Sequence, residues 1–471
     1  MPAATPVFAI IGHPNEGKSS VLSTLAEDDS VRVSPTPGET TEVQSFPVII
    51  DGQEIIRFVD TPGFQNPRQT LIWMQAYDGP AAQLLSSFIA AHHNDPDFHD
   101  ECSLLTPVDQ GAGIIFVVDG SRPVRNTDKT EMEILRLTGA PRLAVINSKE
   151  NDSSYLNSWH AEFRKHFNAI RIFNSCRATY IQRIELLESL KAIDQHLEPV
   201  LKKVITTFEA DWQARQQRTA DLIVELLRSV LDYRTTATCG EHNDEKQVKA
   251  KLVRDYMNFV SSREEQTRKA IRTLYKHNIF DLDLPPHSIL QEDLFSERTW
   301  EFLGLSDRQL VVAGAVSGAA IGVGIDLAAG GVSFGVFSAL GGLIGATGTL
   351  FKGKDLVDNF ELLGMKFGGE QVQVGPAANI QLLFILVDRC LLFYSHVINW
   401  AHGRRDYDQN LLLKKQDGDK KGFTSNWSSD DRKVCSQFFH ALHKQDSEGL
   451  EKTSKRLYEI IVRQLQQLSK E

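Results

Sequence analysis

Hydrophobic and polar residues follow two different patterns along the chain. Over about the first 180 residues, short apolar runs rich in β-branched residues are separated by stretches with helical spacing. Runs with the length of a buried strand lie at 7–11, 43–50, 54–59, 113–118, 143–146 and 169–173. Because strands that alternate with helices form parallel sheets, this pattern predicts an α/β domain with a mostly parallel sheet over residues 1–180.

From residue 181 the strand signals disappear, and apolar residues recur at helical spacing, as in Ala220, Ile223, Val224 and Leu227. We therefore expect the rest of the chain to be mainly α-helical. Its predicted parts are a helical region 181–307, broken by a polar stretch near 235–244, a glycine-rich hydrophobic segment 308–352 and a C-terminal helical region 353–471.

The glycine-rich segment is almost free of charge. Within residues 309–351, Asp326 is the only ionisable residue, and Gly314, Gly318 and Gly322 recur every four positions. On a helix this spacing makes a groove where another backbone can approach closely. Three structures are compatible with it: a membrane hairpin, a packed glycine-zipper core, and an element buried in one state and released to a membrane in another. The length of the segment favours the membrane hairpin, although the arm before Asp326 is shorter than the roughly 20 residues that a span needs.

Two further helices are expected in the C-terminal region. The stretch 380–400 is apolar but carries Asp388 and Arg389, which favours a core helix over a membrane span. The stretch near 450–468 has the pattern of an amphipathic helix.

Composition limits the classes of function. The chain has 51 Lys and Arg against 61 Asp and Glu, a net charge of −10, which argues against a nucleic-acid reader with a strongly basic face. Its five cysteines include no CxxC pair, so neither a disulfide framework nor a zinc cluster is implied, and reduced cytoplasmic thiols are expected. The N-terminus lacks the features of a secretory signal. We expect a cytoplasmic protein that is peripheral to, or inserted in, the inner membrane.

Residues 12–19, GHPNEGKS, match the pattern GxxxxGK[ST] directly after a predicted strand and before a predicted helix. In this context backbone N–H groups turn inward around phosphates, and Gly17 and Ser20 are expected to take part in nucleotide binding. Lys18 is expected to reach the β- and γ-phosphates, and Ser19 to offer its hydroxyl to Mg²⁺.

A second motif, DTPG, ends the strand predicted at 54–59. Asp60 there can hold Mg²⁺ through water, and the N–H of Gly63 can meet a γ-phosphate. Between the two motifs, the turn-rich stretch 36–41, TPGETT, supplies hydroxyls that could complete the Mg²⁺ shell when a triphosphate is present.

These three motifs together resemble those of the Era, EngA and TrmE group of bacterial GTPases, and the resemblance covers residues 6–180. It implies an α/β P-loop GTPase domain that binds GTP or GDP with Mg²⁺ and hydrolyses GTP. By the resemblance, Thr40 occupies the switch I position and binds Mg²⁺ with Ser19 and Asp60, while Lys18, Thr40 and Gly63 serve catalysis. Glu39 and Thr41 depart from the usual GTTR pattern, so Thr41 competes with Thr40 for this position.

The base-recognition motifs are weaker. Asn147 and Glu150 stand where the group has N-K-x-D, and Ser175 and Cys176 lie in a stretch that resembles the S-A-[KL] loop. A carboxylate there accepts two N–H bonds from guanine and would be left unpaired by adenine. Ser148 cannot cover the base as Lys does, and the segment is also compatible with an ordinary helix N-cap.

Hydrolysis is expected to be slow. Phe64 follows DTPG, where Ras-like enzymes place a water-orienting Gln, and an apolar side chain cannot hydrogen-bond that water. In the resembling group, Asn at the position of Asn15 can help to hold K⁺ near the phosphates, which would stimulate turnover. Asn15 could equally serve only to fix the loop.

Between the second motif and the next strand, residues 64–111 form a long insertion with a helix-like run at 75–93. It exceeds an ordinary connection, so it is either a switch-linked element that contacts a partner or a packing helix.

The whole chain resembles a bacterial set in which an Era-like GTPase domain precedes a domain of unknown function. The sequence predicts a Mg²⁺-dependent GTPase switch with a helical effector region that meets membrane lipid or a membrane protein, and a homodimer is a further candidate assembly. A ribosome or RNA-assembly factor is disfavoured by the acidic balance, and a nucleotide-binding scaffold with little hydrolysis is the third alternative.

Overall fold

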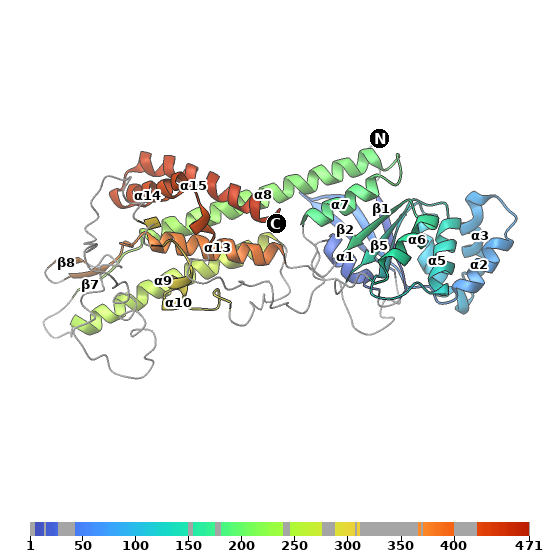
Figure 1. Cartoon of the computed structure of the whole chain (residues 1–471), viewed down its shortest axis with the longest axis horizontal. Coiled ribbons are helices and arrows are strands. Elements are labelled where there is room, and N and C mark those ends of the chain that lie inside the picture. Colours follow the sequence, from blue (N-terminus) through green and yellow to red (C-terminus); the bar gives the residue numbers. More distant parts are fainter. Residues whose placement is uncertain are drawn as a thin grey trace. The chain divides into compact units, whose positions relative to one another are not determined.

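The computed structural model describes residues 5–13, 16–26, 43–148, 154–174, 180–238, 245–275, 288–306, 309–310, 366–368, 371–399 and 422–470. The chain divides into two compact units (Figure 1). The first contains the described residues up to Ala214, and the second contains most of those from Arg215 onward. Each unit is described by itself.

In the described part of the first unit, six strands form one sheet in the order β2-β3-β1-β4-β5-β6. Strand β2 is antiparallel to β3, and the other neighbours are parallel. All six strands predicted from the sequence are confirmed, as is the mostly parallel sheet. The strands are β1 (Val7–Ile11), β2 (Gln44–Ile50), β3 (Gln53–Asp60), β4 (Gly113–Asp119), β5 (Arg142–Asn147) and β6 (Ala169–Phe173).

Helices cover both faces of this sheet, as apolar side chains on both faces of a strand require. Phe8 and Ile10 of β1 face a core formed with α1 (Lys18–Ala26), α7 (Tyr180–Lys191) and the first part of α8 (Glu198–Leu231). Ala9 and Ile11 face the opposite core, to which the insertion, α5 (Asn126–Leu137) and α6 (Leu156–His166) contribute. Because residues of α8 as far as Phe208 belong to the first core, this unit runs beyond residue 180, the domain limit predicted from the sequence.

The insertion consists of three short α-helices and two 3₁₀ turns. Its elements are α2 (Pro67–Ala76), η1 (Ala81–Gln83), α3 (Leu84–His92), η2 (Pro96–Phe98) and α4 (His99–Asp109). The run 75–93, predicted as one helical stretch, is divided, because Gly79 and Pro80 separate α2 from η1 and α3. Proline has no N–H and glycine disfavours helix, so neither continues α2.

The described part of the second unit is mainly helical, as predicted. It contains the rest of α8, α9 (Glu245–Leu274), α10 (Glu297–Phe302), α13 (Gln381–Ile398), η6 (Phe423–Asn426), α14 (Ser429–Lys444) and α15 (Ser447–Leu468). A small antiparallel sheet in the order β7-β9-β8 was missed in the sequence: β7 (Thr235–Thr238), β8 (Lys366–Gly368) and β9 (Gln371–Val374). Strand β7 is only four residues long and pairs with a segment far along the chain, so no local pattern marks it.

Helix α13 is the one helix in the described ranges that is long and apolar enough to cross a membrane, and 89% of its apolar window is buried inside the protein. Asp388 is fully buried and accepts hydrogen bonds from the N–H groups of Gly304 (2.7 Å) and Thr424 (2.8 Å). Arg389 pairs with Glu264 at 2.7 Å. These contacts satisfy both charges inside the core, which confirms the prediction of a core helix. Residues 311–351 lie outside the described residues, so the membrane hairpin stays a prediction.

Candidate functional site

The predicted phosphate-binding loop lies between the end of β1 at Ile11 and the start of α1 at Lys18. Gly12 has φ +152°, and a Cβ on it would lie 2.2 Å from the carbonyl oxygen of Val117 in β4. Only glycine therefore lets this loop pass so close to the neighbouring strand. Gly17, with φ +90°, turns the chain into α1.

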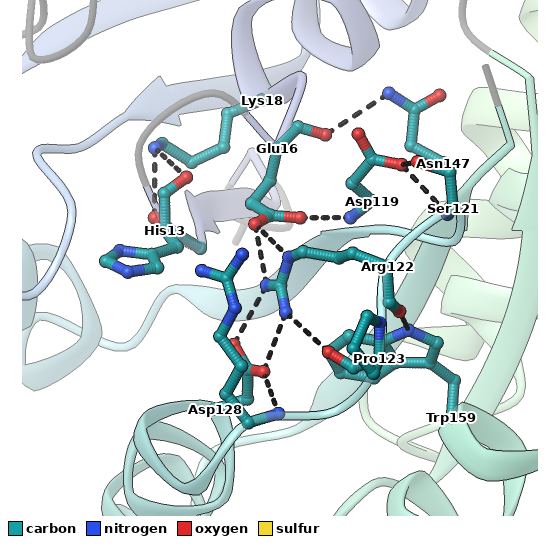
Figure 2. Close-up of polar contacts among 12 residues, drawn as sticks. His13, Glu16, Lys18, Asp119, Ser121, Arg122, Pro123, Asp128, Asn147 and Trp159 are labelled. Carbon is teal, nitrogen blue, oxygen red and sulfur yellow. Dashed lines mark hydrogen bonds and ion pairs between the residues drawn. The ribbon is translucent and has the colours of Figure 1, made fainter. Parts of the chain in front are cut away.

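The side chain of Lys18 hydrogen-bonds to the backbone of the loop that precedes it. Its Nζ donates to the carbonyl oxygens of Gly12 at 2.9 Å and His13 at 3.2 Å, and its side chain is buried (Figure 2). Burial lowers the pKa of Lys18, and the negative charge of Asp60 is the largest effect that acts against it. An ammonium has three N–H donors, so a third remains to reach a phosphate oxygen.

The structure brings Ser19 and Asp60 together. Ser19 Oγ donates to Asp60 Oδ2 at 3.3 Å, although the two residues belong to different elements, α1 and β3. Asp60 pairs with Ile10 in the register of the sheet, so the end of β3 lies beside the end of β1. A hydroxyl and a carboxylate are oxygen ligands of the kind that Mg²⁺ prefers, so this pair fits the metal that the motifs imply.

The segment after Asp60 is also tied to the loop. Thr61 Oγ1 donates to the carbonyl oxygen of Ile10 at 2.8 Å, and Gly63 lies buried two residues further on. Phe64 is 2% exposed and belongs to the core that contains Ile11. The residue after DTPG is therefore an apolar side chain packed in the core, and it cannot hydrogen-bond a water molecule at the position where Ras-like enzymes have a Gln.

Asn147, at the end of β5, links the predicted base-recognition segment to the loop. Its side chain is 1% exposed, and its Nδ2 donates to the carbonyl oxygen of Glu16 at 3.2 Å. The site thus contains residues at the carboxyl ends of β1, β3 and β5. These ends lie at the same edge of the sheet because the three strands are parallel.

The structure therefore describes part of the predicted site. The described residues of the predicted site are Gly17, Lys18, Ser19, Ser20, Asp60, Gly63 and Asn147. Ser20 is a buried residue of α1. Five predicted residues lie outside the described ranges, and their roles stay predictions: Asn15, Thr40, Glu150, Ser175 and Cys176.

A charge cluster that sequence reasoning missed lies beside the loop (Figure 2). The Glu16 carboxylate accepts hydrogen bonds from the backbone N–H of Asp119 and from Arg122 Nε, the latter at 2.6 Å. Arg122 also makes two bonds to Asp128, at 2.7 and 2.9 Å. The only signal in the sequence was the stretch DGSRP at 119–123, because nothing local shows that an arginine there meets a carboxylate over a hundred residues earlier.

Glu131 of α5 was also missed. Its side chain is 1% exposed, and its two carboxylate oxygens have no hydrogen-bond partner among the residues that the structure describes. Burial, with the negative charges of Asp128 and Glu16, raises its pKa to about 8, against the opposing effect of Lys18 and Arg122. Glu131 is therefore mostly protonated at neutral pH.

Comparison with known families agrees with this geometry. Residues 7–148 match the family described as 50S ribosome-binding GTPase, so the first unit contains a GTPase domain of this group. Residues 160–467, more than half of the chain, match the domain of unknown function DUF3482. The chain belongs to the DUF3482 family. The predicted fusion of a GTPase domain to a domain of unknown function is thus confirmed.

Curated relatives are similar over the N-terminal region. GTPase Der of Pseudothermotoga lettingae is 25% identical over 43% of this chain, which spans only 41% of that protein. The probable GTP-binding protein EngB of Burkholderia cenocepacia (strain HI2424) is 24% identical over 42% of this chain and 90% of that protein. A crystal structure of Era in complex with MgGDPNP and nucleotides 1506-1542 of 16S ribosomal RNA is 15% identical, covers 57% of this chain and 89% of that one, and has a TM-score of 0.28.

Proposed function

We propose that this DUF3482-family protein is a Mg²⁺-dependent switch that binds GTP or GDP and hydrolyses GTP. The observation that carries the proposal is the meeting of Lys18, Ser19 and Asp60 around one glycine-lined loop. These groups come from two motifs about 40 residues apart in the sequence, and together they supply a cation and two oxygen ligands where a nucleotide's phosphates would lie. The matched GTPase family supports guanine nucleotide as the ligand.

Each residue has a defined part in this proposal. Lys18 binds the β- and γ-phosphates, and Ser19, Asp60 and Thr40 hold Mg²⁺, which supplies charge neutralisation when bound. The N–H of Gly63 binds the γ-phosphate, so Thr40 and Gly63 are ordered by GTP and released after hydrolysis. Glu150, with Ser175 and Cys176, reads the base.

Slow and K⁺-stimulated hydrolysis belongs to the same proposal. Buried Phe64 cannot orient the attacking water, so charge from a K⁺ held with the help of Asn15 would compensate. Turnover should then be faster in K⁺ than in Na⁺ at equal ionic strength, and Asn15→Ala should remove the difference. Equal rates in the two salts would refute the K⁺ proposal without touching nucleotide binding.

Titration of the full chain with fluorescent GTP, with and without Mg²⁺, tests the main proposal. We expect tight binding that weakens when Mg²⁺ is chelated, competition by GTP and GDP but not by ATP, and slow release of phosphate. Equal competition by ATP would refute guanine recognition by Glu150. Binding without phosphate release would favour the nucleotide-binding scaffold.

For the helical region we propose a membrane-associated effector role, which rests on the sequence of residues 311–351. A second candidate is a ribosome or RNA-assembly GTPase, favoured by the description of the matched family as ribosome-binding and opposed by the net charge of −10. Cell fractionation distinguishes them, because the first predicts the membrane pellet and the second predicts co-sedimentation with ribosomal subunits.

A further inference from the structure

A glutamate in a phosphate-binding loop is electrostatically unfavourable. Glu16 lies two residues before Lys18, and its side chain is 5% exposed. Its negative charge acts on the Lys18 ammonium. In the low dielectric of a buried site, the same charge would repel the phosphates of a nucleotide.

Arg122 compensates this charge. Its guanidinium contacts the Glu16 carboxylate at 2.6 Å, and the arginine side chain is only 13% exposed. A second carboxylate, that of Asp128, accepts two bonds from the same guanidinium and one at 2.6 Å from the backbone N–H of Arg125. The guanidinium thus joins the loop to the start of α5 in a fixed fork geometry.

The backbone of Arg122 is held as well. Trp159 of α6 is fully buried, and its Nε1 donates to the carbonyl oxygen of Arg122 at 2.8 Å. The Arg122 guanidinium lies over the Trp159 ring, 5.0 Å from the ring centroid. Figure 2 shows the guanidinium between the two carboxylates, with Trp159 beneath the backbone turn that carries it.

We propose that Arg122 is a positioning residue for nucleotide binding, which neutralises Glu16 and holds the phosphate-binding loop against α5. This inference rests on the proposed function, because the nucleotide is the ligand whose binding Arg122 supports. The β4–α5 loop, which lies outside both the loop at 12–19 and the DTPG motif, then contributes to nucleotide affinity.

The test is a charge-removal and rescue experiment on nucleotide affinity, with fluorescent GDP and GTP in the presence of Mg²⁺. Arg122→Met keeps much of the side-chain volume and removes the charge, so Glu16 is left uncompensated. We expect affinity to fall by about tenfold or more, since a buried charge that loses its partner is costly. In Glu16→Gln/Arg122→Met the repelling charge is also gone, and affinity should return to within a few-fold of wild type.

Lys129→Met is the matched control, because it removes one positive charge from an exposed position of α5, directly after Asp128, and keeps the backbone N–H that Asp128 uses. Its affinity should equal that of wild type. Thermal unfolding without nucleotide, measured on every variant, separates loss of affinity from loss of fold. Should Arg122→Met fail to fold, Arg122→Lys and Glu16→Gln/Arg122→Lys take its place, since a lysine point charge cannot bridge both carboxylates.

The inference is overturned if the folded Arg122 variant binds nucleotide like wild type, or if adding Glu16→Gln does not relieve its defect. A wild type that binds no nucleotide would refute the proposed function, and this inference with it. A wild type that binds tightly beside unaffected variants would refute the role of Arg122 alone.

Discussion

Lys18 makes the most direct residue-scale prediction. It donates to two loop carbonyl oxygens and is the cation expected at the phosphates. Lys18→Ala should therefore weaken GTP binding at least a hundredfold, because both a charge-assisted bond and the loop geometry are lost. Nucleotide titration together with circular dichroism checks this. A folded Lys18→Ala protein that binds like the parent would remove the assignment of the loop.

Glu131 makes a prediction about pH. Its folded-state pKa of about 8 lies above the usual value of 4.5, so the folded protein retains a proton that the unfolded chain releases. Stability from this group is present below pH 4.5 and is lost as the pH rises through about 8. The glutamine in Glu131→Gln cannot titrate. Between pH 5 and pH 8 the free energy of unfolding of wild type should therefore fall by about 2–4 kcal/mol relative to that of Glu131→Gln.

Denaturant unfolding without nucleotide at several pH values measures this difference. Thr130→Ala is the control on the same helix, because Thr130 has no ionisable group and its hydroxyl donates to the carbonyl oxygen of Asn126 in an exposed hydrogen bond. Its difference from wild type should stay constant between pH 5 and pH 8. A Glu131→Gln difference that is equally constant would show that Glu131 is ionised in the folded state.

At the scale of elements, Glu101 connects α4 to the segment that follows DTPG. It is fully buried, and its Oε1 accepts from the backbone N–H groups of Gln65 at 2.7 Å and Asn66 at 2.5 Å. These donors precede the first turn of α2, so the carboxylate satisfies a helix N-terminus. These bonds join the last helix of the insertion to its first residues, two and three positions after Gly63, so the insertion closes on itself directly after the DTPG motif.

Glu101→Ala should lower the free energy of unfolding by about 1–3 kcal/mol, because it removes the charged acceptor of two part-buried backbone N–H groups. Glu101→Gln keeps an oxygen acceptor and should cost less. Asp109→Ala, at an exposed acidic position at the end of α4, is the control and should have little effect. Chemical denaturation gives the three values, and equal losses in the alanine and glutamine variants would contradict the capping role.

At the scale of the whole molecule, the membrane proposal makes the decisive prediction. Residues 311–351 hold one carboxylate, Asp326, in an otherwise uncharged stretch, and burying such a stretch in lipid is favourable if the carboxylate is protonated, paired or near the far interface. Wild type should therefore float with liposomes. Gly318→Glu should remain below, because a charge on the glycine groove opposes both close packing and lipid.

The helix α13 supplies a comparison within the same chain. It passes a test of length and composition for membrane spans, yet 89% of its apolar window is buried by protein. Length and mean hydropathy alone therefore do not separate a core helix from a span. Wild type that stays in the soluble fraction in both GTP and GDP would favour the packed glycine-zipper core for residues 311–351.

The sequence by itself determined the features that are local along the chain. Strand periodicity and motif spacing depend only on a few consecutive residues. The sequence could therefore predict the six strands of the first sheet, the loop at 12–19 and the carboxylate at Asp60. The charges of α13 likewise pointed to a core helix, since a charged pair in an apolar helix needs protein partners.

Only the tertiary structure decided which distant polar groups meet. Glu16 and Arg122 lie 106 residues apart, β7 pairs with β9 across more than a hundred residues, and the burial that raises the pKa of Glu131 depends on how α5 packs beside the loop. A local pattern states that a residue is polar or apolar, but the partner that compensates a buried charge is set by the packing of elements far apart in the sequence.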